Sequence, residues 1–135
     1  MSLAKRGLTK DQLERLTARS PDMVIATDRK GRVIYFNDGA HDTLGYESEE
    51  VLGEFVGIFY PTIDEARRVG DAMRSPEYGG EFRVSAFETT FVARSGEHIP
   101  VAISGTILYD DEGQPDGTIG YAKDGAPVIE PQTVA

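Results

Sequence analysis

Cysteine is absent from the chain of 135 residues. Without a thiol, the protein forms no disulfide, no thiolate metal site, no cysteine nucleophile and no cysteinyl cofactor adduct. A sequence without cysteine fits a reducing compartment, and we expect a cytoplasmic protein.

Long hydrophobic runs and clusters of basic residues are also missing. No apolar run approaches the roughly 20 residues of a membrane-spanning helix, so no membrane segment is expected within these residues. The N-terminal sequence "MSLAKRGLTK" lacks the apolar region of a signal peptide. The net charge of −9 argues against nucleic-acid binding, because contacts to phosphates need clustered Lys and Arg.

What remains is an ordinary globular composition, with 39% hydrophobic and 27% charged residues, which suits one domain with one core. Residues 8–21 predict an amphipathic helix that Thr9 caps and Pro21 ends. Leu13 and Leu16 form its narrow apolar stripe. This stripe suits packing on its own domain or pairing with a second copy, and both alternatives stay open.

Residues 22–37 predict a β-hairpin, with a turn at "DRKG". Asn37 ends the second strand and is placed to cap a short helix over residues 38–45. Ser48 is expected to cap a second short helix. Most acidic residues of this stretch therefore have a local structural role.

The segment "FVGIFYP" at 55–61 is apolar and is expected to be buried. Thr62 then caps a helix that reaches residue 73. The last third of the chain alternates apolar and polar residues with the period of β-strands. Strands that are segregated from helices predict an α+β fold, with an antiparallel sheet covered on one face by the helices between 38 and 73.

The space between these helices and the sheet is either a pocket for a small molecule or a plain hydrophobic core, and the sequence does not separate the two. The residues expected there are Ile25, Leu44, Phe55, Ile58, Phe59, Ile63, Ala66, Val69, Thr89, Phe91, Val101, Ile103, Ile119 and Tyr121.

The sequence gives little support for a catalytic or metal site. His41 is expected to be a solvated helix residue, with a pH-sensitive contact as the alternative. His98 falls on the exposed side of a strand, and no histidines or carboxylates stand at the spacing of metal ligands. Because capping explains the acidic residues between 38 and 50, we expect no enzymatic activity.

Four segments together resemble the PAS domain, a small sensory module of histidine kinases, chemoreceptors and cyclic-dinucleotide enzymes. In chain order they are "GRVIYFNDGAHDTLGYESEEVLGE", "FVGIFYP", "ETTFVARSGEHIPVAIS" and "DDEGQPDGTIGYAKD". The resemblance covers roughly residues 20 to 124. Of the Asp-Ile-Thr that often ends the family's last strand, only Asp124 is kept.

The resemblance implies a five-stranded antiparallel sheet with short helices over one face and an N-terminal flanking helix. The expected division is a leader and flanking helix at 1–20, the PAS domain at 21–124 and a linker at 125–135. It also implies a non-catalytic sensory role in which a bound ligand or partner shifts the sheet, and flanking helices pass the shift to an output domain. A ligand-free homodimerisation module, paired through Leu13 and Leu16, is the alternative.

The resemblance leaves the cofactor unassigned. Flavin photosensors of the light–oxygen–voltage kind need a reactive cysteine, which is absent. Haem-binding members present a histidine from the helix that here spans 63–73, and this helix has none; its Met73 is expected in the core. The expected partners are a second copy of the chain, a small ligand and the output domain of a parent protein, such as a histidine kinase of a two-component system.

Overall fold

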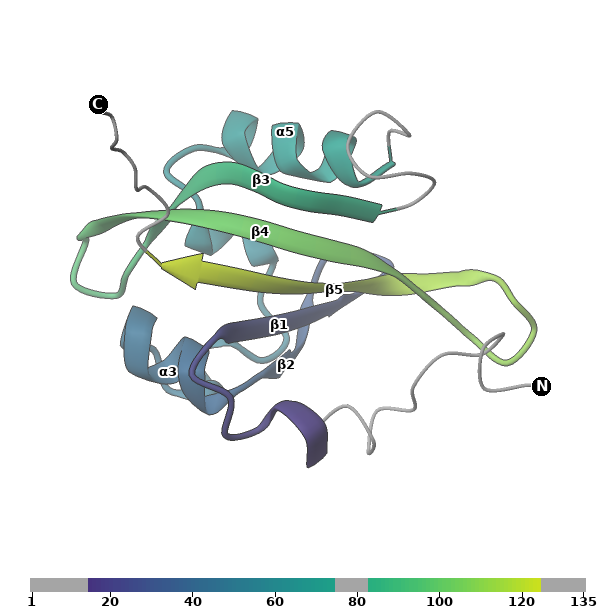
Figure 1. Cartoon of the computed structure of the whole chain (residues 1–135), viewed down its shortest axis with the longest axis horizontal. Helices are drawn as coiled ribbons and strands as arrows, with labels where there is room; N and C mark the ends of the chain where they lie inside the picture. Colours follow the sequence, from purple (N-terminus) through teal and green to yellow (C-terminus); the bar gives the residue numbers. More distant parts are fainter. Residues whose placement is uncertain (1–14, 75–82, 125–135) are drawn as a thin grey trace, which may run out of the picture.

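The computed structural model describes residues 15–74 and 83–124, and these form an antiparallel five-stranded sheet with short helices over one face (Figure 1). The strands are β1 (Met23–Asp28), β2 (Val33–Phe36), β3 (Arg83–Val92), β4 (His98–Tyr109) and β5 (Pro115–Asp124). Their order across the sheet is β2-β1-β5-β4-β3, so the last strand lies at the centre. The predicted fold class is confirmed.

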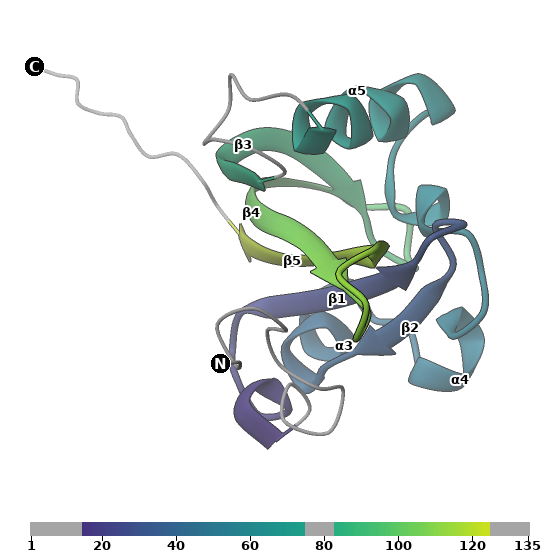
Figure 2. The ribbon, with the colours of Figure 1, turned by 90° about the vertical axis from the view of Figure 1, so that its right-hand side faces the viewer.

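The connection between β2 and β3 carries the helical cover. It contains α3 (Asp38–Leu44), α4 (Ser48–Val51), the 3-10 helix η1 (Val56–Phe59) and α5 (Ile63–Arg74). Figure 2 shows α4 and α5 on the same side of the sheet. No helix among residues 15–74 and 83–124 is long and apolar enough to span a membrane.

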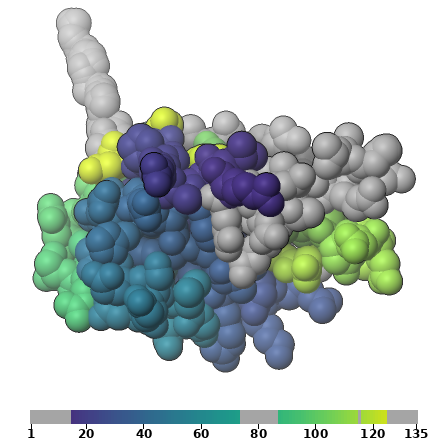
Figure 3. All heavy atoms as spheres, turned by 90° about the horizontal axis from the view of Figure 1, so that it is seen from below, coloured from purple at the N-terminus to yellow at the C-terminus, as the bar shows by residue number. Residues whose placement is uncertain are grey.

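Two turns extend the sheet in opposite directions. In Figure 3 the β3–β4 turn (green) and the β4–β5 turn (yellow-green) project at the two ends of the molecule. The expected N-terminal helix is described only from residue 15, with helical backbone at 15–17. Thr9 and Leu13 lie outside the described residues.

The strand register places apolar side chains on the inner face, toward the helices. On β3 and β4 the predicted alternation is confirmed, because the pairs are Phe87 with Ile103, Thr89 with Val101 and Phe91 with Ile99. These six residues are buried, and side chains two residues apart on a strand share one face.

An aromatic cluster centred on Phe59 fills the core beneath η1. The Phe59 ring is fully buried, stacks on Phe36 at 5.6 Å and meets the edge of Tyr46 at 5.6 Å. The expectation that all of 55–61 is buried is wrong for Phe55 and Ile58, which are 44% and 39% exposed. In a 3-10 helix with three residues per turn, only part of the segment faces the core.

Asn37 connects α3 to β1 and to the N-terminal segment. Its Oδ1 accepts hydrogen bonds from the backbone N–H of Val24 (2.9 Å) and of Ala40 (3.0 Å). Its Nδ2 donates to the carbonyl oxygens of Thr17 (2.7 Å) and Asp22 (3.0 Å). The predicted cap of α3 is therefore also a buried cross-link, with Asn37 only 3% exposed.

The other two described caps differ from each other. Thr62 Oγ1 accepts from the Glu65 N–H at 3.1 Å, as expected at the start of α5. At α4 the N-cap is Glu47 rather than Ser48, which is the first helical residue. Glu47 and Glu50 form a reciprocal capping box, in which the longer carboxylates replace the expected hydroxyl.

Candidate functional site

A cavity of about 270 Å³ lies between the inner face of the sheet and the cover formed by η1 and α5. Its walls come from β1, β3, β4 and β5 on one side and from the two helices on the other. The lining residues are Met23, Ile25, Thr27, Asp28, Arg29, Val56, Tyr60, Ala66, Val69, Gly70, Met73, Phe91, Ile103, Ile107, Gly117, Thr118, Gly120 and Ala122. Most are apolar, as is typical of small-molecule sites.

Of two paired glycines at the centre of the sheet, Gly120 leaves room for the cavity and Gly105 does not. On the inner face, Gly120 of β5 pairs with Ile25 of β1 and with Gly105 of β4. A Cβ at Gly105 would lie 2.8 Å from the Met73 methyl, which occupies that space. A Cβ at Gly120 would approach only Ile103 and a backbone oxygen, at 3.6 Å or more. The unfilled volume therefore lies over Gly120.

The polar groups on the β1–β5 wall are paired within the protein. The Thr27 and Thr118 hydroxyls lie 2.8 Å apart. Asp28 Oδ1 accepts from the backbone N–H of Lys30 (2.8 Å) and of Arg32 (3.0 Å) in the β1–β2 turn. The hydrogen bond from the Arg32 backbone holds the pKa of Asp28 below its usual value.

Tyr60 contributes a polar group from the helical side. Its ring meets the edge of Phe91 at 5.3 Å with an interplanar angle of 81°. Burial, together with the negative charge of Glu65, raises the pKa of the Tyr60 hydroxyl above its ordinary value. The described residues offer this hydroxyl no hydrogen-bond partner.

Side-chain bonds of Glu65, Arg68 and Thr89, which we call the clasp, hold the cavity-covering helix α5 to β3. Glu65 accepts hydrogen bonds from Arg68 Nε (3.0 Å) and Nη2 (2.6 Å) and from the Thr89 hydroxyl. Arg68 also donates to the Glu88 carbonyl (2.9 Å) and lies 4.6 Å above the Phe87 ring. The bonds from Arg68 and Thr89 lower the pKa of Glu65 to about 2, so it is a carboxylate at neutral pH.

A family model described as "PAS domain" matches residues 21–124. The chain belongs to the PAS domain family. No curated protein sequence matches it.

Solved PAS and LOV domains share its fold. A PAS domain from Colwellia psychrerythraea aligns with a TM-score of 0.71 at 20% identity, covering 84% of this chain and 94% of that one. The PAS domain of an HTR-like protein from Haloarcula marismortui aligns at 0.66 and 23% identity, with 84% and 89% covered. The LOV domain of a blue-light-activated histidine kinase from Erythrobacter litoralis aligns at 0.64 and 18% identity, with 81% and 100% covered.

The predicted pocket residues of this PAS domain fall into three groups. Ile25, Ala66, Val69, Phe91 and Ile103 line the cavity. Leu44, Phe59, Thr89 and Val101 are buried in the core around it. The remaining five are Phe55, Ile58, Ile63, Ile119 and Tyr121, which the structure places outside the cavity.

Ile119 and Tyr121 lie on the outer face of the sheet, opposite the helices. In β5 the inward positions belong to Thr118, Gly120 and Ala122, which pair with inward residues of β1. Because side chains alternate along a strand, the larger apolar residues of β5 point outward. Ile119 packs in a second apolar cluster there, and Tyr121 is 42% exposed.

Several lining residues were not expected from the sequence. Met23 and Thr27 share the phase of Ile25 on β1, so alternation carried a signal for both. The sequence carries no pattern that predicts the other unexpected lining residues, Thr118, Gly120 and Tyr60. A small residue in a strand does not indicate a cavity beside it, and a tyrosine in an apolar segment does not indicate which way its ring points.

His41 lies outside the cavity, in an exposed polar network at the end of α3. Its Nδ1 is 3.1 Å from Asp42 Oδ1 and its Nε2 is 3.1 Å from Glu47 Oε2. The hydrogen bonds to Asp42, then to Glu47, raise the pKa of His41. His98 is exposed on β4. Within residues 15–74 and 83–124, no three His, Asp or Glu side chains gather as metal ligands would.

Proposed function

We propose that this PAS domain is a non-catalytic sensory module whose cavity binds a small, largely apolar molecule. The observation that carries the proposal is the cavity of about 270 Å³ between the sheet and the clasped helix α5. Ligands prefer concave, mostly apolar sites with few polar groups, and this cavity has that character. A cytoplasmic location and an output domain in a parent protein remain part of the proposal.

A ligand in this cavity touches the sheet and its cover at once. Bound molecules shift a conformational equilibrium only by their differential affinity for the two states. A ligand that contacts both α5 and β5 binds two conformations of the domain with different affinity if α5 shifts relative to the sheet between them.

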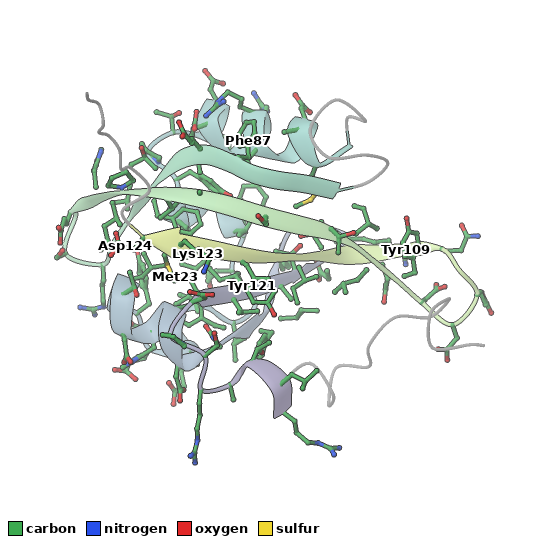
Figure 4. The ribbon with its side chains drawn as sticks, viewed as in Figure 1. Met23, Phe87, Tyr109, Tyr121, Lys123 and Asp124 are labelled. Carbon is green, nitrogen blue, oxygen red and sulfur yellow. The ribbon has the colours of Figure 1, made fainter. Side chains whose placement is uncertain are left out.

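The shift has a short path to the end of the domain. Ala122 lines the cavity and pairs with Met23, the residue that starts β1 and is labelled in Figure 4. The next residue, Lys123, forms an ion pair at 3.2 Å with Asp22, just before β1. Asp124 then ends β5, so a displacement of this strand moves both the N-terminal segment and the exit of the chain.

The proposal is tested by native mass spectrometry of the purified chain. We expect the wild type to retain a small molecule, and Gly120→Val to lose it because the added side chain occupies the cavity. Ala102→Val, which creates the same side chain on the outer face of β4, is the control and should retain the molecule. A wild type that neither retains a small molecule nor binds one from a metabolite mixture would overturn the proposal.

A second candidate function is homodimerisation through the outer face of the sheet. The Thr17 hydroxyl lies 2.7 Å from the Tyr35 hydroxyl, which places the N-terminal segment at this face. Beside it, Leu16 is 69% exposed and Tyr121 is 42% exposed. We expect the change of Leu13 and Leu16 to Ser to weaken dimerisation in sedimentation experiments; unchanged sedimentation would reject this interface.

A further inference from the structure

Tyr60 is held from two sides at the wall of the cavity. Its backbone N–H donates to the Gly57 carbonyl at 3.0 Å, which fixes it at the end of η1. Its ring packs edge-on against Phe91. The hydroxyl therefore has a defined position before any ligand arrives, which lowers the ordering cost of a bond to it.

Tyr60 is half-buried, with its ring packed on Phe91 and its side chain lining the cavity. Burial raises its pKa, so it stays protonated and is a hydrogen-bond donor across the physiological range. Buried polar groups in native proteins are nearly always bonded, and an unpaired one needs an explanation. Within the described part of the chain this hydroxyl has no partner, which points to an acceptor that comes from outside the chain.

Other polar groups at the cavity are already engaged. Thr27 and Thr118 bond each other, and Asp28 Oδ1 binds the backbone of its own turn. Arg29 also lines the cavity, but it is exposed to solvent. Among the described residues that line the cavity, Tyr60 therefore offers a hydroxyl donor that no other side chain engages.

The charges around the cavity select against an anionic acceptor. Glu65 is ionised and acts on the Tyr60 hydroxyl, and Asp28 adds a second carboxylate at the wall. Arg29 is exposed and Asp28 is partly exposed, so water screens both charges, and Glu65 is the charge that acts on the Tyr60 hydroxyl. A carboxylate beside Tyr60 would be repelled, whereas a neutral carbonyl oxygen accepts the bond without that penalty.

We propose that Tyr60 is the polar anchor of the cavity and donates a hydrogen bond to a neutral acceptor, of the carbonyl kind, on a small and otherwise apolar ligand. This inference rests on the proposed function. The volume of about 270 Å³ lies just below the usual range of roughly 300–1,000 Å³ for ligand pockets, so the ligand has the size of a single ring or a short chain.

Three probes of similar shape test the inference on the full chain by calorimetry or ligand-observed NMR: acetophenone, ethylbenzene and benzoate. Acetophenone and ethylbenzene differ in the carbonyl oxygen, and benzoate adds the negative charge. We expect the wild type to bind acetophenone about three- to tenfold more tightly than ethylbenzene, the range of one hydrogen bond, and benzoate most weakly.

Tyr60→Phe should bind acetophenone and ethylbenzene equally, while its affinity for ethylbenzene stays unchanged because the ring is kept. Tyr46→Phe is the matched control, since Tyr46 packs on Phe59 and does not line the cavity. It should keep the wild-type preference for the ketone.

The outcomes separate the two proposals. Equal binding of acetophenone and ethylbenzene by the wild type, or a preference that survives in Tyr60→Phe, overturns the role of Tyr60 and leaves a ligand-binding cavity in place. Tightest binding of benzoate overturns the neutral class. No probe binding while native mass spectrometry finds another retained molecule also overturns the inference alone; no binding and no retained molecule overturn both.

Discussion

Two glycines of this PAS domain, Gly39 and Gly120, stand in opposite surroundings. A Cβ at Gly39 in α3 would lie 2.3 Å from the Asp22 carbonyl oxygen and 2.6 Å from that of Ser20. A Cβ at Gly120 in β5 would make only ordinary contacts, the nearest at 3.6 Å to Ile103. One end of the helical cover is thus packed to backbone contact, whereas the middle of the sheet has space above it.

The polar side chains follow the same division. Beside Gly39, Asn37 has its acceptor and its donor engaged by five backbone groups. Above Gly120, the Tyr60 hydroxyl has no partner among the described residues, and α5 is held by the partly exposed side chains of the clasp. The α3 end therefore serves as scaffold, and the α5 side is the part that can adjust to a ligand.

The largest expected effect is at Asn37. Asn37→Ala leaves the N–H groups of Val24 and Ala40 buried without an acceptor, and should lower the free energy of unfolding by about 3 kcal/mol or more. Urea denaturation measures this. Asn37→Asp keeps the acceptor but turns a buried carboxylate oxygen toward the carbonyl oxygens of Thr17 and Asp22, and should destabilise at least as much as Asn37→Ala. A loss below about 1 kcal/mol for Asn37→Ala would contradict the scaffold role.

Gly39→Ala should have the second-largest effect on stability, and it should destabilise the domain although glycine-to-alanine changes in helices usually stabilise. Glycine to alanine inside a helix ordinarily stabilises by roughly 0.5–1 kcal/mol. Here the methyl meets backbone oxygens that cannot rotate away, and we expect a loss of about 2–3 kcal/mol, as for overpacked cores. Thermal unfolding followed by circular dichroism reports the shift. A neutral or stabilised variant would show that α3 is not packed against residues 20–22.

Sequence reasoning predicted the scaffold better than the site, and the reason is physical. Asn37 as a cap and the inward faces of β3 and β4 follow from local chemistry and from period-two alternation. In β5 the same alternation misled, because the small residues Gly120 and Ala122 face inward and the larger Ile119 faces outward. In β5 the inward positions face the cavity and carry small residues, while Ile119 packs in the apolar cluster of the outer face, so side-chain size does not mark the inward phase.

The cavity itself depends on long-range geometry. Its floor at Gly120 is defined by strands that pair across about ninety residues of sequence, and its cover by Glu65 meeting Thr89. Phe55 and Ile58 were expected inside because they are apolar, yet Phe55, just before η1, is exposed, and the 3-10 helix turns Ile58 outward. Apolar composition alone does not give the direction of a side chain in such a segment.

The clasp should contribute less than the scaffold, and its contribution should depend on pH. The pKa of Glu65 is lowered from 4.5 to about 2 on folding, so the stabilisation is present above pH 4.5 and is lost as the pH falls toward 2. Glu65→Gln should lose about 1–2 kcal/mol at pH 7 and show less acid dependence. Urea denaturation at several pH values between 7 and 2 measures both effects.

A neighbouring carboxylate provides the control for the clasp. Asp64 pairs with Arg67 at 3.6 Å, and its side chain is 88% exposed. Asp64→Asn should leave stability nearly unchanged at every pH, because exposed ion pairs contribute little. If the free energy of unfolding depends equally on pH in the wild type and in Glu65→Gln, the clasp does not account for the stabilisation of α5.

The smallest expected effect on stability is that of Gly120→Ala, beside the cavity. The methyl enters free space at a backbone angle that alanine adopts readily, and it reduces the freedom of the unfolded chain. We expect a gain of about 0.5 kcal/mol, against the clear loss for the same substitution at Gly39. The difference between the two variants, measured under identical conditions, reports how unequally the domain is packed. Should Gly120→Ala destabilise as strongly as Gly39→Ala, the space above β5 would not exist in solution, and the cavity would lose its floor as a ligand site.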